Sequence, residues 1–183
     1  MPRRETPKFT GVITHRDRLG RYAIRHPTDW RRSEIEGRDG VMFFPDPRDQ
    51  QTYLSVWATE LEEHVVAEDL APLAGGVADG LGALADCQVE QSSDVVLGNL
   101  VKFERVFTFR EGGATRKRKL WLLYVDKWLI SLTWQGATED DYDHWLSMAN
   151  YSYATFTIPE ALWFATDRDL VGYTRAREHT DRT

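Results

Sequence analysis

One short acidic segment holds the side chains best suited to metal chemistry. It contains Glu60, Glu62 and Glu63, followed by His64. Carboxylates beside an imidazole can coordinate a divalent cation. The same composition is typical of a solvated acidic loop that holds no ion. No metal motif accompanies the segment, and no two histidines stand four residues apart, so we expect neither a metal nor another cofactor.

The sequence shows no pattern typical of a catalytic nucleophile. The chain lacks the Gly-x-Ser-x-Gly pattern of a nucleophile elbow, and its single cysteine, Cys87, falls between a predicted helix and a predicted strand. A small buried thiol is the expected role of this residue. Gly75-Gly76 and Gly80-x-Gly82 imitate a phosphate-binding loop only loosely, because no strand leads into them and no Lys-Ser/Thr pair follows. We therefore predict no catalytic residue.

One basic run is suited to binding. Arg116, Lys117, Arg118 and Lys119 are consecutive, and four adjacent cations create a local positive field that can meet phosphates or an acidic partner. The alternative is that alternate side chains point to opposite faces of a strand and only keep it solvated. In the register predicted below, Lys119 lies opposite Trp134, where a cation–π contact would occupy it.

A second binding feature follows Pro159. Leu162, Trp163 and Phe164 are three large apolar residues in a row, and their burial at about 25 cal/mol per Å² would contribute several kcal/mol. They either pack onto their own domain or anchor another chain, and we expect the covering surface to be partly intermolecular. The polar tail after Asp167 is predicted to be mobile and dispensable.

Composition narrows the class of protein. The 183 residues include seven Trp, seven Tyr and eight Phe, which argues for a folded chain of one domain. Twenty-three basic against 29 acidic residues give a net charge of -6, which disfavours nucleic-acid binding. One cysteine excludes an internal disulfide, and no apolar run is long enough for membrane insertion. With no signal-like segment at the N-terminus, we expect a cytoplasmic location.

The first half of the chain alternates short strands with turns. Residues 11–16, 21–25, 40–44 and 53–59 read as strands separated by turn-forming residues. Residues 68–85 form the predicted helix, because apolar side chains recur there at three- and four-residue spacing: Leu70, Leu73, Val77, Leu81 and Leu84. Four glycines weaken this helix, so packing must hold it.

The second half predicts an antiparallel meander. Residues 100–110, 117–125 and 128–134 read as strands, and a two-residue turn at Asp126-Lys127 sets three pairs opposite one another: Val125 and Trp128, Leu123 and Ile130, Trp121 and Leu132. These side chains form the core face. Ser131 and Thr133 lie on the reverse face, which we expect to be covered less completely. A second helix begins at Thr138, and residues 155–158 form a short last segment.

The order of these elements resembles a known superfamily. Tyr22-Ala23-Ile24 followed by His26-Pro27-Thr28-Asp29-Trp30 is similar to the opening of the PsbP/Mog-like superfamily, and Val41-Met42-Phe43-Phe44-Pro45 and Leu54-Ser55-Val56-Trp57 continue the match. The resemblance spans residues 10–158, leaving an N-terminal arm at 1–9 and a C-terminal extension at 159–183. It implies an α+β fold, an α/β/α sandwich around an antiparallel β-sheet flanked by helices.

The resemblance also implies a class of function. The superfamily includes extrinsic subunits of the photosynthetic water-oxidising complex, Ran-binding proteins, bacterial lipoproteins and secretion-effector chaperones, and most members bind proteins without catalysis. It implies a non-catalytic protein-binding module: an adaptor, assembly subunit or small chaperone in a bacterial cytoplasm. Its partner is another protein or a second copy, and the candidate partner-binding residues are Leu162, Trp163, Phe164, Arg116, Lys117, Arg118 and Lys119.

An enzyme is the competing hypothesis. A small-ligand or metal-dependent enzyme would use a cleft beside the sheet that holds His64, Glu60, Glu62 or Asp143. Asp143 belongs to a second acidic cluster, at the start of the second predicted helix. Convergence of two or more of these side chains in one concave pocket would favour the enzyme.

Overall fold

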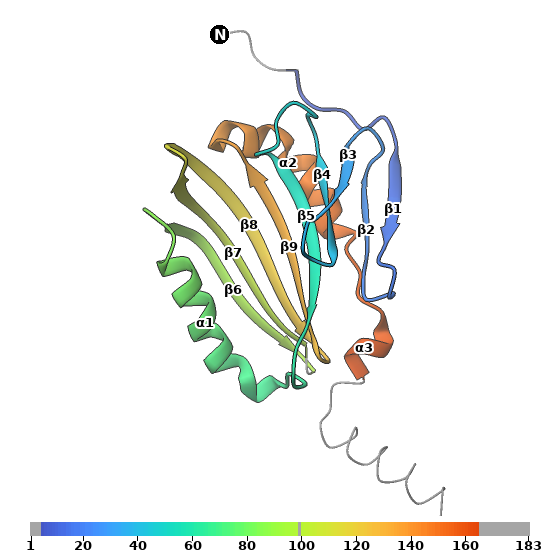
Figure 1. The fold of residues 1–183 in the computed structure, drawn as a ribbon, viewed down its shortest axis with the longest axis vertical. Coiled ribbons are helices and arrows are strands. Elements are labelled where there is room, and N and C mark those ends of the chain that lie inside the picture. Colours follow the sequence, from blue (N-terminus) through green and yellow to red (C-terminus); the bar gives the residue numbers. More distant parts are fainter. Residues whose placement is uncertain (1–4, 99, 165–183) are drawn as a thin grey trace, which may run out of the picture.

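Two antiparallel sheets and their helices build the fold (Figure 1). The structure, a computed structural model, describes residues 5–98 and 100–164. Its elements follow in the order β1 (Val12–Arg16), β2 (Ala23–Pro27), β3 (Arg31–Glu34), β4 (Gly40–Phe44), β5 (Tyr53–Glu60), the 3₁₀-helix η1 (Ala67–Asp69), α1 (Leu70–Gly82), β6 (Gln88–Leu97), β7 (Leu100–Glu111), β8 (Ala114–Val125), β9 (Trp128–Gly136), α2 (Glu139–Ala154) and α3 (Glu160–Phe164).

The larger sheet has seven strands in the order β3-β4-β5-β9-β8-β7-β6, and β1 pairs with β2 in a separate hairpin. The β8–β9 register is the predicted one, with Val125 opposite Trp128 and Trp121 opposite Leu132. Asp126 makes the turn between these strands with a φ of 52°, a conformation that Asp adopts more readily than most residues. The predicted meander is confirmed.

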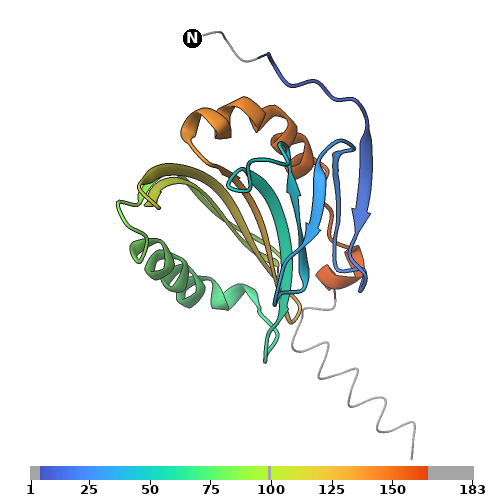
Figure 2. The same ribbon diagram turned by 45° about the horizontal axis from the view of Figure 1, so that its top comes forward.

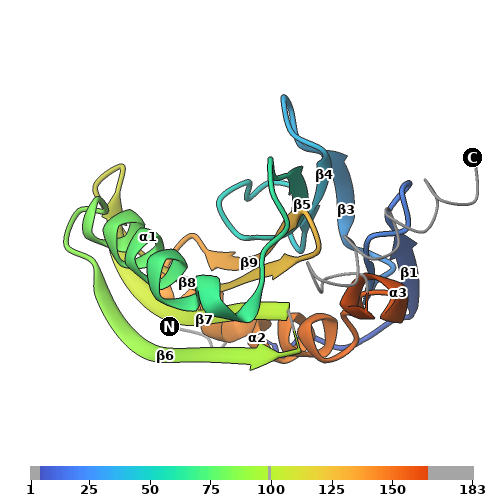
Figure 3. The ribbon, with the colours of Figure 1, turned by 90° about the horizontal axis from the view of Figure 1, so that it is seen from below.

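Helices lie on opposite sides of the curved sheet (Figures 2 and 3). α2 covers the main core, where Ile130, Leu132 and Trp134 are fully buried. α1 packs over a second, smaller core built around Val77, Val101 and Phe103. The layer order is therefore helix, antiparallel sheet, helix, which is the predicted α+β sandwich.

Thr138 begins α2 as predicted. Its hydroxyl accepts a hydrogen bond from the backbone N–H of Asp141 at 3.1 Å, which satisfies one of the free donors of the first turn. Gly136 allows the tight entry into this helix, because a Cβ there would lie 2.3 Å from the backbone nitrogen of Tyr142.

A buried charged group fastens the β1–β2 hairpin to the larger sheet. The Arg21 guanidinium is 2.7 Å from Asp17 Oδ2 and 2.6 Å from Asp39 Oδ2, and it lies 4.7 Å from the centre of the Trp128 ring. Burial alone would raise the pKa of Asp17, but hydrogen bonds from Arg21 outweigh it and hold that pKa below its usual range. These contacts join three segments that are distant in sequence.

Several sequence expectations were wrong. β3 and β6 were not predicted, because both are polar edge strands without an apolar alternation. The predicted helix ends at residue 85, whereas α1 ends at Gly82; its start is close to the predicted one, because η1 begins at Ala67 and α1 at Leu70. The short last segment predicted at residues 155–158 contributes a single bridge, between Thr157 and Ala23. Ser131 is only 2% exposed and Thr133 is also buried, so the reverse face is better covered than expected.

Candidate functional site

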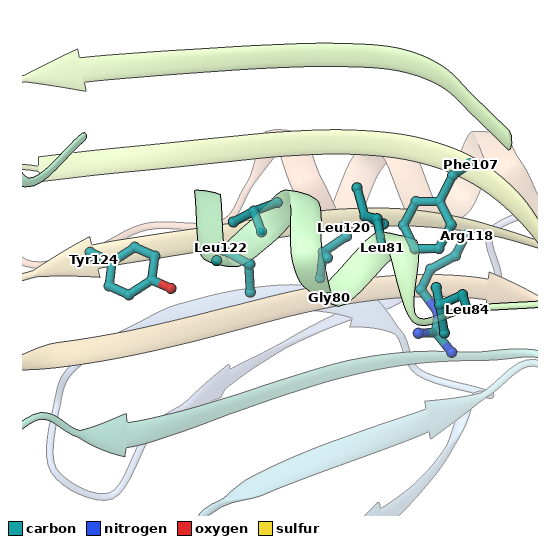
Figure 4. A pocket seen from close by; sticks show the side chains of 10 residues that line it. Gly80, Leu81, Leu84, Phe107, Arg118, Leu120, Leu122 and Tyr124 are labelled. Carbon is teal, nitrogen blue, oxygen red and sulfur yellow. The ribbon is translucent and has the colours of Figure 1, made fainter. Parts of the chain in front are cut away.

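A groove lies between α1 and the sheet (Figure 4). We call it the α1 groove; its volume is about 270 Å³, and it is lined by Gly76, Val77, Gly80, Leu81, Leu84, Phe107, Arg118, Leu120, Leu122 and Tyr124. Eight of the ten residues are apolar, and the carbons of the aliphatic and aromatic side chains dominate its walls. Val77 is the only buried residue of α1, and Leu70, Leu73 and Leu81 pack against the same cluster while remaining partly exposed.

Two glycines shape the helical wall of the groove. Gly76 and Gly80 are four residues apart and share a face of α1, and a Cβ on either would have no atom within 4 Å. Close packing therefore does not require glycine at these positions. Each glycine costs the helix about 1 kcal/mol relative to alanine. What the two residues provide is open space along the groove.

Arg118 supplies the cationic end of the α1 groove. Its Nε donates to Gln135 Oε1 at 2.9 Å, a second N–H bonds the same oxygen, and the guanidinium lies 4.7 Å from the centre of the Phe109 ring. Among the side chains that the structure describes, no carboxylate pairs with Arg118. Three of its five N–H groups remain available to a ligand.

Gln135, the cross-strand neighbour of Arg118 on β9, holds the guanidinium in place. Its side chain is 1% exposed, and its Nε2 donates to the backbone oxygen of Gln51 at 3.2 Å. This bond fixes the amide so that its oxygen faces the guanidinium. Sequence reasoning missed Gln135 because a single Gln within a strand carries no motif; the predicted β8–β9 register alone would have placed it opposite Arg118.

The basic run divides between the two faces of β8. Arg116 and Arg118 face the α1 side, whereas Lys117 and Lys119 face α2, as alternation along a strand requires. Arg116 pairs with a carboxylate oxygen of Glu111 at 2.7 Å. Lys117 pairs with Glu90 on β6 at 2.8 Å, and Lys119 pairs with Glu104 on β7 at 3.6 Å. The four cations therefore do not form one patch.

Lys119 lies opposite Trp134 as the register predicted, but its aromatic contacts are different from those expected. Its ammonium lies 4.7 Å from the centre of the Tyr153 ring and 5.8 Å from that of Trp121. Trp134 is fully buried beneath α2, which keeps its ring out of reach of a strand-surface cation.

The metal-ligating candidates lie at two separate places in the fold. His64 Nδ1 lies 2.5 Å from Asp126 Oδ1, and Glu60 pairs with Lys127 at 2.5 Å, both at the β8–β9 turn. Asp143 lies in α2, which begins beyond the opposite end of β9. Across residues 5–98 and 100–164, no three His, Cys, Asp or Glu side chains are close enough to hold a metal ion.

Cys87 is the remaining candidate nucleophile. Cys87 is half-buried, and burial raises the pKa of its thiol, the opposite of what activates a nucleophile.

Leu162, the first of the three C-terminal apolar residues, is half-buried and packs against the main core. The side chains of Trp163 and Phe164, and the tail after Asp167, lie outside the described residues.

Comparison with known proteins shows the fold. No family model and no curated protein matches the chain. Among solved structures, cyanobacterial PsbP (CyanoP) from Synechocystis sp. PCC 6803 aligns with a TM-score of 0.60 at 16% identity, over 83% of this chain and 95% of that one. LpqN, involved in cell envelope biogenesis of Mycobacterium tuberculosis, aligns with a TM-score of 0.54 at 19% identity, over 75% and 83%.

A weaker similarity, with a TM-score of 0.48 at 12% identity, links the chain to the Ran-binding protein Mog1p from Saccharomyces cerevisiae, over 81% of this chain and 95% of that one. The chain has a PsbP/Mog-like fold, as its sequence motifs predicted. None of its described helices offers an apolar stretch long enough to cross a bilayer.

Proposed function

We propose that this chain is a non-catalytic protein-binding module, serving as an adaptor, an assembly subunit or a small chaperone in a bacterial cytoplasm. Residues 10–158 form the binding domain, and the extension at 159–183 adds a second contact through Leu162, Trp163 and Phe164. The partner is another protein, whose apolar side chains enter the α1 groove and whose polar or acidic group meets Arg118.

The open glycine face of the α1 groove carries this proposal. Gly76 and Gly80 lower the stability of α1 and pack against nothing, whereas the space that they leave is apolar and of the size that one or two inserted side chains fill. Insertion of apolar anchors into such a groove is a common mode of peptide recognition. The separation of Asp143 in α2 from Glu60 and His64 at the β8–β9 turn, together with the raised pKa of Cys87, also favours binding over catalysis.

Filling the groove tests the proposal. In Gly80→Leu, the new side chain projects into the α1 groove without meeting any existing atom at its Cβ, so the fold is retained and α1 gains helix propensity. We expect capture of partner protein from the native cell, measured by affinity purification and mass spectrometry, to fall by about tenfold or more.

The matched control is Gly75→Leu. Gly75 lies in the same helix and has the same open surroundings, but it does not line the α1 groove. This variant is expected to capture the same proteins as the parent chain. Equal capture by both leucine variants, or loss of capture in both, would contradict a binding role for the groove.

A further inference from the structure

A second depression lies on the outer face of the β1–β2 hairpin, away from the α1 groove. The hairpin register sets Thr14 opposite Arg25 and Arg16 opposite Ala23, so the two arginines are diagonal neighbours on one face. Their guanidinium groups can therefore reach the same ligand from neighbouring strands.

The segment that follows α2 forms the third wall. Thr157 exchanges two backbone hydrogen bonds with Ala23, each of 2.9 Å, which fixes this segment beside β2. The depression that results has a volume of about 310 Å³ and is lined by Thr14, Arg16, Ala23, Arg25, Thr155 and Thr157. Two arginines and three threonines thus line one space.

The positive charges of this depression are not neutralised. Arg18 and Arg21, in the same hairpin, pair with Asp39, whereas no described carboxylate pairs with Arg16 or Arg25. Residues 14–32 contain six arginines and two aspartates, although the whole chain carries a net charge of -6. The hairpin is therefore a local site of positive potential on an acidic protein.

Two of the three hydroxyl groups are available as donors. Thr155 donates its only hydroxyl proton to the backbone oxygen of Tyr151 at 2.9 Å, so it offers no donor to an anion. The side chains of Thr14 and Thr157 make no hydrogen bond within the part of the chain that the structure describes. Two hydroxyl donors, Thr14 and Thr157, therefore lie beside the two unpaired guanidinium groups of Arg16 and Arg25.

We propose that this depression binds a phosphate monoester. Guanidinium groups bond phosphate oxygens in pairs, and donors that approach from three segments suit a tetrahedral anion better than a planar carboxylate. Its volume lies at the lower end of the range for small-molecule sites, which leaves room for part of the organic substituent. The site is separate from the α1 groove and does not depend on the proposed function.

The test is a titration of the full-length chain with inorganic phosphate and with phenyl phosphate, at low ionic strength and about pH 7.5, where both are largely dianionic. Binding is followed by the amide NMR shifts of Ala23 and Thr157. In the double variant Arg16→Gln/Arg25→Gln, we expect both dissociation constants to rise by about tenfold or more. Both arginines are exposed, so the melting temperature is expected to stay unchanged.

The control is Arg48→Gln/Arg110→Gln, which removes the same charge from two exposed arginines outside the depression. It is expected to bind both anions as the parent chain does. Tighter binding of phenyl phosphate than of inorganic phosphate supports a monoester as the ligand, whereas equal or weaker binding would assign the site to the free anion and contradict the monoester. Absence of binding to the parent chain, or equal losses in the two double variants, would overturn the proposal.

Discussion

Single glycines have two opposite roles in this chain. At Gly136 an added Cβ would lie 2.3 Å from the Tyr142 nitrogen and 2.5 Å from the Thr138 oxygen, both backbone atoms that cannot rotate away. At Gly75 an added Cβ would meet nothing within 4 Å. The first glycine is required by close approach, and the second is a cost to the helix that contains it.

The substitution Gly136→Ala is therefore expected to lower the free energy of unfolding by about 3 kcal/mol, because the junction between β9 and α2 must shift. Gly75→Ala is expected to raise it by up to about 1 kcal/mol. Urea unfolding of the two variants measures both changes. Shifts of the same sign would show that the contacts around Gly136 are not the close ones described above.

Among the elements, the β1–β2 hairpin carries two histidines in apolar surroundings. The His26 ring stacks on Phe43 at 4.0 Å between ring centres, and the His15 ring lies 5.9 Å from the same phenyl ring. Burial lowers the pKa of both imidazoles, and Arg32 adds to the effect. Both side chains are consequently neutral in the folded chain at a pH where the unfolded chain begins to protonate them.

This difference predicts acid sensitivity of a definite sign. Below about pH 6.5 the unfolded state binds more protons than the folded state, so stability falls as the pH falls through this value. Urea unfolding is expected to show a lower free energy of unfolding at about pH 5.5 than at about pH 7.5, and His26→Gln is expected to lose less over the same interval. An identical loss in the variant would exclude His26 as a source.

Apolar elements were predictable from sequence and polar ones were not. Alternation around Leu123 and Ile130 predicted the β8–β9 pairing, because a one-residue slip would have turned these side chains to the other face. β6 has Gln, Ser and acidic residues and is held by backbone pairing with β7, for which no side-chain period is needed. The sequence therefore indicated three of the strands around the α1 groove but not the edge strand beyond them.

The groove itself was only half predictable. The apolar period of Leu73, Val77 and Leu81 placed one face of α1 on the sheet, and Arg118 was a candidate binding residue. Gly76 and Gly80 were recognised as weakening the helix, but their open surroundings depend on the distance between α1 and the sheet. How α1 packs on the sheet is a tertiary property that involves Val101 and Phe103 as well as Val77, and no local pattern encodes it.

At the scale of the whole molecule, the proposed contact role of the segment at residues 159–183 can be tested by truncation. Leu162 is half-buried on the main core, whereas residues 10–158 contain both cores. A chain ending at Ile158 is therefore expected to fold, with a loss of about 1–2 kcal/mol in unfolding free energy and weaker partner capture. A chain ending at Asp169 is expected to match the parent in both measurements. Unfolding of the shorter chain would assign the C-terminal aromatic residues to the core of the domain.

Site-specific photo-crosslinking in the native cell tests the central claim, that the α1 groove receives another protein. A photoreactive phenylalanine analogue replaces Leu84, which lines the groove, or Leu19, which is 60% exposed at the β1–β2 turn. We predict that illumination joins the Leu84 variant to a discrete protein partner, that Gly80→Leu in the same chain suppresses this adduct, and that the Leu19 variant does not form it. The same adduct from both positions, or an adduct at Leu84 that Gly80→Leu leaves unchanged, would contradict the claim.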